Sequence, residues 1–204
     1  MGRLRNWAYH LGMRVAMSPL FPATIGRPTL LRFIGVRLPA SSAIGSGTIV
    51  GGPWHHFGER VFINTDCFLD GAASITMADD VRIGARTVII TGTHNVQTCV
   101  VRRDLHEPTI CLPVTIGRGT WIGAGCTVLP GVSIAEGCVI GAGAVVTKST
   151  SPNGLYVGNP AKRIKDLQVN TPSDVGAEHG ASYALDPNIP RSLGRQPGIA
   201  VRGH

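Results

Sequence analysis

A single histidine stands where a regular pattern of the sequence stops. His94 closes the stretch Ile-Ile-Thr-Gly-Thr-His, and residues 95–109 after it do not follow the spacing found on either side. An imidazole changes its protonation near neutral pH, so a histidine beside a loop can take the proton of a substrate hydroxyl as a general base. Taken alone, such a histidine is more often an ordinary surface residue, and its interpretation depends on the elements around it.

The surrounding pattern repeats every six residues. An aliphatic residue recurs at this interval, and a small or β-branched residue stands two positions before each one, which is the spacing of one face of a strand. Glycine directly follows three of the aliphatics, at Gly117, Gly123 and Gly141, where a chain that turns a corner needs a permissive backbone. The aliphatics of this stretch are Ile116, Ile122, Val128, Ile134, Ile140 and Val146. Short strands joined by corners are typical of a hexapeptide-repeat β-helix.

The same spacing continues towards the N-terminus and resumes after the break. Three hexads make a coil of about 18 residues, and successive coils stack about 4.8 Å apart. We therefore predict an all-β fold, a left-handed parallel β-helix over residues 38–167, with residues 95–109 as an extruded loop; the hand is taken from the known architecture. The further apolar residues at this repeat position are Leu38, Ile44, Val50, Phe57, Ile63, Leu69, Met77, Ile83, Ile89 and Ile110, and their inward partners include Thr93 and Val114.

The two ends of the chain differ from this repeat. Residues 1–37 carry six arginines and no acidic residue, which nearly accounts for the net charge of +7. We expect a basic, partly helical arm that either contacts a membrane surface or an anionic saccharide, or packs across the end of the column with its arginines in solvent; the second is favoured. Nucleic acid is not expected, because no aromatic residues interleave with the basic ones. Residues 168–204 are rich in Gly, Pro, Ser and Asn and predict a largely disordered tail.

Composition bounds the cellular setting. No apolar run reaches 18 residues, and His10 and Arg14 interrupt the N-terminal apolar stretch, so neither a membrane span nor a signal peptide is expected. The five cysteines show no metal-type spacing, and three of them occupy small inward positions, where buried free thiols are expected. These features favour a cytoplasmic protein without a bound metal.

Several motifs together resemble a known family. They are Thr-x-Thr-His at residues 91–94, Pro-Val-x-Ile-Gly-x-x-x-Trp-Ile-Gly at 113–123, Val-Val-Thr-Lys at 145–148 and Gly-Asn-Pro-Ala-Lys at 158–162. Over roughly residues 57–167 the sequence is similar to the maltose, galactoside and nodulation-factor O-acetyltransferases of the hexapeptide-repeat class. The resemblance implies a homotrimer with active sites between neighbouring columns, acetyl-CoA as co-substrate and a sugar-like acceptor.

The resemblance also implies roles for individual residues. His94 would be the catalytic base. Asn64 would line the same site, although a corner residue that caps the backbone is the alternative. Asp70 would contact the acceptor, and Trp121 would form an apolar wall or pack against a neighbouring subunit.

The cofactor residues follow from the same motifs. Ala124 and Ala142 would let backbone groups meet the pantetheine amides. The CoA phosphates would be bound by residues near the C-terminal end of the column, where positive charge gathers: Thr147, Lys148, Lys162 and Lys165.

Other functions remain open at the level of sequence. A xenobiotic acetyltransferase of the streptogramin or chloramphenicol type would share the column and the histidine, and a non-catalytic scaffold module would share the column alone. A zinc carbonic anhydrase on this fold needs three convergent histidines, whereas His55, His56 and His106 are expected in irregular segments. Residues 1–56 resemble exopolysaccharide acetyltransferases more than the maltose enzymes, so the acceptor is not fixed.

Overall fold

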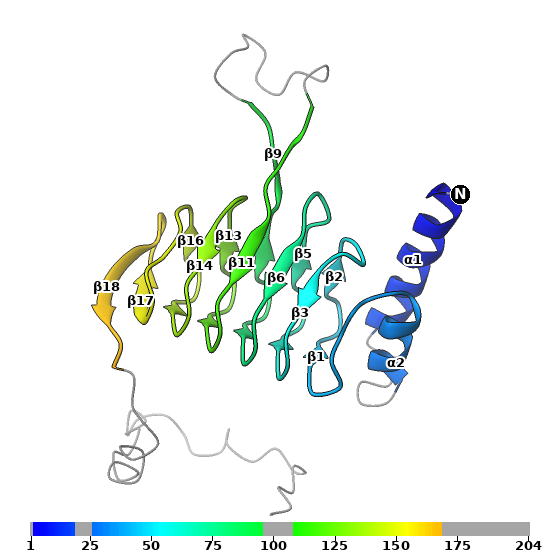
Figure 1. Cartoon of the computed structure of the whole chain (residues 1–204), viewed down its shortest axis with the longest axis horizontal. Coiled ribbons are helices and arrows are strands. Elements are labelled where there is room, and N and C mark those ends of the chain that lie inside the picture. Colours follow the sequence, from blue (N-terminus) through cyan, green and yellow to red (C-terminus); the bar gives the residue numbers. More distant parts are fainter. Residues whose placement is uncertain (1, 19–25, 96–107, 169–204) are drawn as a thin grey trace, which may run out of the picture. The chain divides into compact units, whose positions relative to one another are not determined.

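The computed structural model describes residues 2–18, 26–95 and 108–168. Two helices, α1 (Gly2–Met17) and α2 (Gly26–Phe33), precede a stack of short strands. The strands of the stack form three sheets, in which each strand pairs in parallel with its counterpart in the next coil (Figure 1). The predicted parallel β-helix is confirmed.

The three sheets are the three faces of the column, here named faces A, B and C. Face A holds β1 (Ala43–Ile44), β4 (Phe62–Ile63), β7 (Arg82–Ile83), β12 (Trp121–Ile122), β15 (Val139–Ile140) and β17 (Gly154–Val157). Face B holds β2 (Ile49–Val50), β5 (Phe68–Leu69), β8 (Val88–Ile89), β13 (Thr127–Val128) and β16 (Val145–Val146). Face C holds β3 (His56–Phe57), β6 (Ile75–Met77), β11 (Val114–Ile116) and β14 (Ser133–Ile134). At the end of face A, β18 (Lys162–Asp166) pairs antiparallel with β17.

The interior is built from the predicted aliphatics. Those of the hexads from Leu38 to Ile89 and from Ile116 to Val146 are all buried, with exposed fractions of 7% or less. Cys67, Cys126 and Cys138 are buried free thiols in the small inward positions, as expected. Each strand has an outward residue beside its inward one, so no coil buries its apolar side except against the next coil.

The chain leaves the column earlier than the spacing predicts. Thr91 takes the last inward position and is fully buried, whereas Thr93 is only half-buried and Ile110 is 40% exposed. β9 (Gly92–Thr93) and β10 (Ile110–Cys111) pair antiparallel as the base of a hairpin, which Figure 1 shows leaving the stack beside β11. The assignment of Thr93 and Ile110 to the interior was therefore wrong, because their backbone groups pair with each other outside the column. Residues 96–107 lie outside the described residues.

The glycines after the aliphatics serve a different purpose from the one predicted. The left-handed backbone of the corner falls two residues later, for example at Gly125, where φ is +67°. A Cβ on Gly123 would instead lie 2.6 Å from the backbone nitrogen of Ala142 in the next coil. Glycine is required there because stacked corners approach closely, not because the chain turns. The early coils are also longer than 18 residues, since Ile44 pairs with Ile63 and Ile63 with Ile83.

The N-terminal helices pack on the first coil. Tyr9, Met13, Ala16 and Met17 are buried on one side of α1, and the hydroxyl of Tyr9 donates to the carbonyl of Val50 in β2 at 3.0 Å. The carbonyl of Met17 accepts a hydrogen bond from the backbone of Gly47. Arg14 and Arg37 are exposed. The boundaries of the predicted arm stay a prediction, and the predicted tail over 168–204 lies outside the described residues beyond residue 168.

His55 was wrongly assigned to an irregular segment. It occupies an inward position of the first coil, is 1% exposed, and its Nδ1 accepts a hydrogen bond from the backbone of Ile75 at 3.0 Å. Its ring lies edge-on to Trp54 and Phe57, and its buried Nε2 has no hydrogen-bond partner. Burial lowers the pKa of His55 to about 4, against a weaker opposite effect of Asp70. The imidazole is therefore a neutral part of the core.

We predict that His55 makes the fold sensitive to mild acid. Its pKa is about 4 when folded and near 6.5 when unfolded, so between these values the unfolded chain binds more protons than the folded one. The stability that the neutral His55 contributes is complete above pH 6.5. As pH falls towards 4 this contribution is lost, and the free energy of unfolding decreases by roughly 3 kcal/mol. His55→Asn, which keeps an acceptor for Ile75, should flatten the fall of melting temperature over this range. His56→Asn, on the outer side of face C, is the matched control and should keep the wild-type slope. Equal slopes for both variants would contradict the prediction.

Candidate functional site

The predicted site residues fall on two corners of the column. The AB corner, where the chain passes from face A to face B, carries Asn64, Ala124 and Ala142 after strands β4, β12 and β15. The BC corner, where the chain leaves face B for face C, carries four others after strands β5, β8 and β16: Asp70, His94, Thr147 and Lys148. The two corners border face B from opposite sides, so one chain does not bring the two groups together.

The AB corner presents backbone with little side chain over it. Ala124 and Ala142 are exposed and stacked in successive coils, with the backbone of Gly143 donating to the carbonyl of Ala124 at 2.9 Å. Asn64 is half-buried two coils below Ala124, and its Oδ1 accepts a hydrogen bond from the backbone of Thr65 at 2.8 Å. This bond is the corner cap that the sequence left open as an alternative. A role for Asn64 in substrate binding stays a prediction.

Asp70 holds the base of the hairpin at the BC corner. Its Oδ2 accepts hydrogen bonds from the backbone of Thr91 and of Gly92, both at 2.9 Å, and from the Thr91 hydroxyl at 3.0 Å. Its Oδ1 accepts from the backbone of Gly71 at 2.8 Å. Burial would raise the pKa of Asp70, but these hydrogen bonds outweigh it and hold the pKa below its usual value. Asp70 is thus an ionised anchor at the point where the chain leaves the column.

His94 lies two residues beyond Gly92, the last backbone amide that Asp70 holds. It follows β9 directly and is half-buried. Thr91, the first threonine of the Thr-x-Thr-His motif, binds Asp70 and also accepts a hydrogen bond from the backbone of Ala73 at 2.9 Å. The sequence analysis did not predict that Thr91 and Asp70 bind each other. The Thr-x-Thr-His motif was a signal for Thr91, but nothing in the sequence pointed to Asp70 as its partner. The contact of Asp70 with an acceptor stays a prediction. The structure shows a second role for Asp70, which is to anchor the base of the hairpin.

Trp121 lies on the outer side of face A rather than at either corner. It is 56% exposed, and its neighbours in register are Arg82 and Val139. The register after the inserted hairpin sets this placement, because β11 resumes on face C in line with β6 and β12 follows on face A. Trp121 and His94 are therefore on different sides of one column.

The basic residues near the C-terminal end are not equivalent. Lys162 and Lys165 are exposed on β18. The turn before β18 is tied to Val145 by two backbone hydrogen bonds: the Val145 amide donates to the carbonyl of Gly158, and the Ala161 amide donates to the carbonyl of Val145. Arg163 is engaged within the chain instead. Its guanidinium pairs with Asp166 and donates to the carbonyl of Ser151 at 3.0 Å. Lys162 and Lys165 are thus available for an anion, whereas Arg163 clamps the end of the column.

The outer rows of faces B and C differ in polarity. On face B the outward residues are Ile49, Phe68, Val88, Thr127 and Val145, and the first two are 51% and 38% exposed. On face C they are His56, Thr76, Thr115 and Ser133, all exposed and polar. Face B therefore presents apolar surface to solvent between the two corners that carry the site residues.

No group of three potential metal ligands converges within residues 2–18, 26–95 and 108–168. His55 is buried in the core and His56 lies outside on face C. His106 lies outside the described residues.

Comparison with known proteins agrees with the architecture. The family model described as bacterial transferase hexapeptide (six repeats) matches residues 113–148. Nodulation protein L of Rhizobium leguminosarum bv. viciae is 34% identical over 145 residues, which cover 64% of this chain and 71% of that protein. This chain belongs to the hexapeptide-repeat acetyltransferase family.

Solved structures of the family share the fold. A maltose O-acetyltransferase from Clostridium difficile 630 superposes with a TM-score of 0.73 at 28% identity, covering 81% of this chain and 88% of that one. A hexapeptide-repeat acetyltransferase from Vibrio cholerae O1 biovar eltor, solved with acetyl coenzyme A, has a TM-score of 0.61 at 30% identity, covering 82% and 87%. The chain spans about half the length of other relatives it matches, 53% of one from Schizosaccharomyces pombe and 57% of one from Staphylococcus aureus.

The anchoring role of Asp70 leads to a prediction about the hairpin. Asp70→Asn removes the negative charge from a side chain that accepts three hydrogen bonds from Thr91 and Gly92, each worth about 1.5–3 kcal/mol when one partner is charged. Hydrogen exchange of the Thr91 and Gly92 amides, followed by NMR, should accelerate by roughly 10- to 100-fold. Asp66→Asn, an exposed carboxylate on the AB corner, should leave this exchange unchanged. If Asp70 served only to contact the acceptor, the variant would raise the acceptor KM without any change in exchange.

Proposed function

We propose that this chain is an acetyl-CoA-dependent O-acetyltransferase that acts on a hydroxyl of a sugar or saccharide. The observation that carries the proposal is the division of the candidate residues between the two corners that border apolar face B. Family membership supports the transfer of an acetyl group. Two structural neighbours, a maltose O-acetyltransferase and an acetyltransferase solved with acetyl coenzyme A, support the acceptor and donor classes.

The proposal requires three copies of the chain. If the B faces of three columns turn towards a common threefold axis, their apolar outer rows are covered. In this closed arrangement the AB corner of each column lies beside the BC corner of the next. Each junction then combines Ala124 and Ala142 of one subunit with His94 of its neighbour. A homotrimer thus completes three sites that a single chain leaves divided.

In this site His94 acts as the general base. It takes the proton from the acceptor hydroxyl while the oxygen attacks the thioester carbonyl of acetyl-CoA. Collapse of the tetrahedral intermediate breaks the carbon–sulfur bond, and the CoA sulfur leaves with the proton that His94 carried. The products are the acetyl ester and CoA, and His94 returns to its neutral form. Asp70 keeps the imidazole in place through the base of the hairpin.

The donor would lie in the groove at each junction. Exposed backbone at Ala124 and Ala142 is suited to the pantetheine amides, because only methyl groups stand over it. Thr147 and Lys148 of the neighbouring BC corner, together with Lys162 and Lys165, would bind the phosphates. Trp121 stands on the outer side of face A, next to the AB corner, where an indole can form one wall.

Two alternatives share parts of this geometry. A xenobiotic acetyltransferase would use the same donor groove and base, and differs only in the acceptor. A scaffold module would need neither His94 nor the Asp70 anchor, and the hydrogen bonds that fix the hairpin favour a catalytic role. Turnover of a panel of sugars and of antibiotic acceptors, followed by release of the CoA thiol, separates the three functions.

His94→Ala should lower turnover by at least about 100-fold, because general-base catalysis supplies 10²–10⁴. Binding of CoA, measured by calorimetry, should persist because His94 does not hold the donor. The matched control is His56→Ala, an exposed histidine on face C, which should retain full turnover. Unchanged turnover in His94→Ala would show that another group removes the proton.

Mixed trimers test whether each site lies between two chains. Ala142→Trp should block the donor groove at the AB corner, while His94→Ala disables the BC corner, and each variant alone should be inactive. When the two are co-expressed in equal amounts, random assembly gives a correct pair at roughly a quarter of the junctions. Activity should therefore recover to roughly a quarter of the wild-type value. No recovery, with mixed trimers verified by mass, would mean that each site is formed by one chain.

A further inference from the structure

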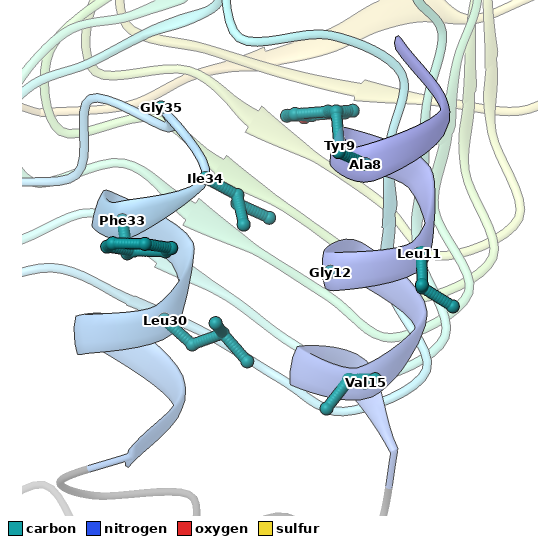
Figure 2. Close-up of a pocket in the computed structure, with 9 residues that line it drawn as sticks. All are labelled: Ala8, Tyr9, Leu11, Gly12, Val15, Leu30, Phe33, Ile34 and Gly35. Carbon is teal, nitrogen blue, oxygen red and sulfur yellow. The ribbon is translucent and has the colours of Figure 1, made fainter. Parts of the chain in front are cut away.

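A groove between the two N-terminal helices has no role in the proposed reaction. It has a volume of about 650 Å³ and is lined on the α1 side by residues that include Leu11 and Val15, and on the α2 side by Leu30, Phe33 and Ile34. Figure 2 shows Leu30 of α2, and Ile34 just after the end of that helix, directed towards α1. All of its lining side chains are apolar, apart from the hydroxyl of Tyr9, which is turned to Val50.

Helix α1 is more apolar than packing on the column requires. One stripe, with Tyr9, Met13 and Met17, is buried against the first coil. A second stripe faces the groove, where Leu11 is 47% and Val15 is 46% exposed. On α2, Phe33 is 87% exposed. Exposed aromatic and aliphatic side chains that rim a groove mark a surface that another molecule covers.

The close approach of the helices fixes the shape of this groove. A Cβ on Gly12 would lie 2.6 Å from Cγ2 of Ile34, so glycine is needed for the helices to meet at this point. The groove is thus a defined part of the fold and its floor is the contact of Ile34 with α1.

The charge around the groove identifies the kind of partner. Arg14, Arg32 and Arg37 are exposed side chains of the segment that carries the groove. Arg14 lies on the other flank of α1, where it lines a second hollow with Gly47 and Ile49, and the Arg32 guanidinium donates to the carbonyls of Leu38 and Pro39. Residues 1–37 contain no acidic residue. A second copy of the chain docked here by twofold symmetry would bring arginines against arginines. An apolar groove on a segment whose charged side chains are all cationic instead matches an anionic lipid surface, where apolar side chains enter the boundary between headgroups and acyl chains.

We propose that the α1–α2 groove docks the protein on an anionic membrane surface. Leu11, Val15 and Phe33 enter the acyl boundary, and Arg14, Arg32 and Arg37 lie at the level of the anionic headgroups. The contact is peripheral: none of the helices described is long and apolar enough to cross a bilayer. This inference is independent of the proposed reaction and does not require His94 or the donor groove.

The test measures binding of the full chain to vesicles by flotation. Vesicles of equimolar phosphatidylcholine and phosphatidylserine should bind the protein in a salt-dependent way, whereas phosphatidylcholine alone should bind it weakly. Leu11→Ser with Phe33→Ser should weaken binding at least about tenfold, because burial of each side chain contributes. Arg14→Gln with Arg37→Gln should weaken it roughly 10- to 30-fold. The matched control, Ile164→Ser with Arg118→Gln, changes one exposed isoleucine and one exposed arginine outside the helices and should bind as wild type.

The outcomes separate the possible occupants. All the changed side chains are exposed, so the melting temperature should stay constant and a loss of binding cannot be a loss of fold. Equal binding to both kinds of vesicle, or full binding by both groove variants, would overturn the proposal. So would a groove variant that lowers the oligomeric mass, since a second copy would then be the occupant. Binding to a soluble anionic polysaccharide but not to vesicles would assign the arginines to a saccharide and also overturn it.

Discussion

Every element of this molecule depends on the stacking of one coil on the next. A strand of two residues cannot bury its own aliphatic side chain, so Ile122 is covered only because Ile83 lies below it and Ile140 above it. The distance between coils is the distance of strand pairing, and it leaves no room at the corners for a Cβ where Gly123 meets Ala142. The interior is therefore filled completely, and chemistry has to be placed on corners, outer faces and inserted segments.

This constraint explains which features could be predicted from the sequence. Burial with a period of six is visible in the residues themselves, and it located nearly every inward aliphatic. The point at which the hairpin departs was not visible, because it depends on hydrogen bonds from Thr91 and Gly92 to a carboxylate about 20 residues away in the chain. His55 was missed for a related reason: a histidine with Nδ1 bound to a backbone amide of the next coil fits an apolar core, and the residue type alone does not reveal that partner.

The candidate site shows the same division. The motifs identified which residues to examine, but only the faces and corners show that they lie in two groups separated by apolar face B. The register of strands β6 and β11 settled the position of Trp121, which the interrupted spacing could not give. The role of glycine at the corners was inferred wrongly because a turn and a close contact call for the same residue. Only the structure distinguishes the two roles: Gly125 has a positive φ, whereas Gly123 lies against backbone atoms of the next coil.

The register around the hairpin also bears on how such proteins diversify. Val114 lies beside Ile75, and Ile116 beside Met77, as though the residues between β8 and β11 were not there. Because Asp70 fastens the chain at its exit and the β9–β10 pair brings the two ends together, the column is insensitive to the length and composition of what lies between them, and the entropy of closing a longer loop rises only slowly. Whatever is inserted beyond the β9–β10 pair can therefore change over evolution without any redesign of the core that carries it.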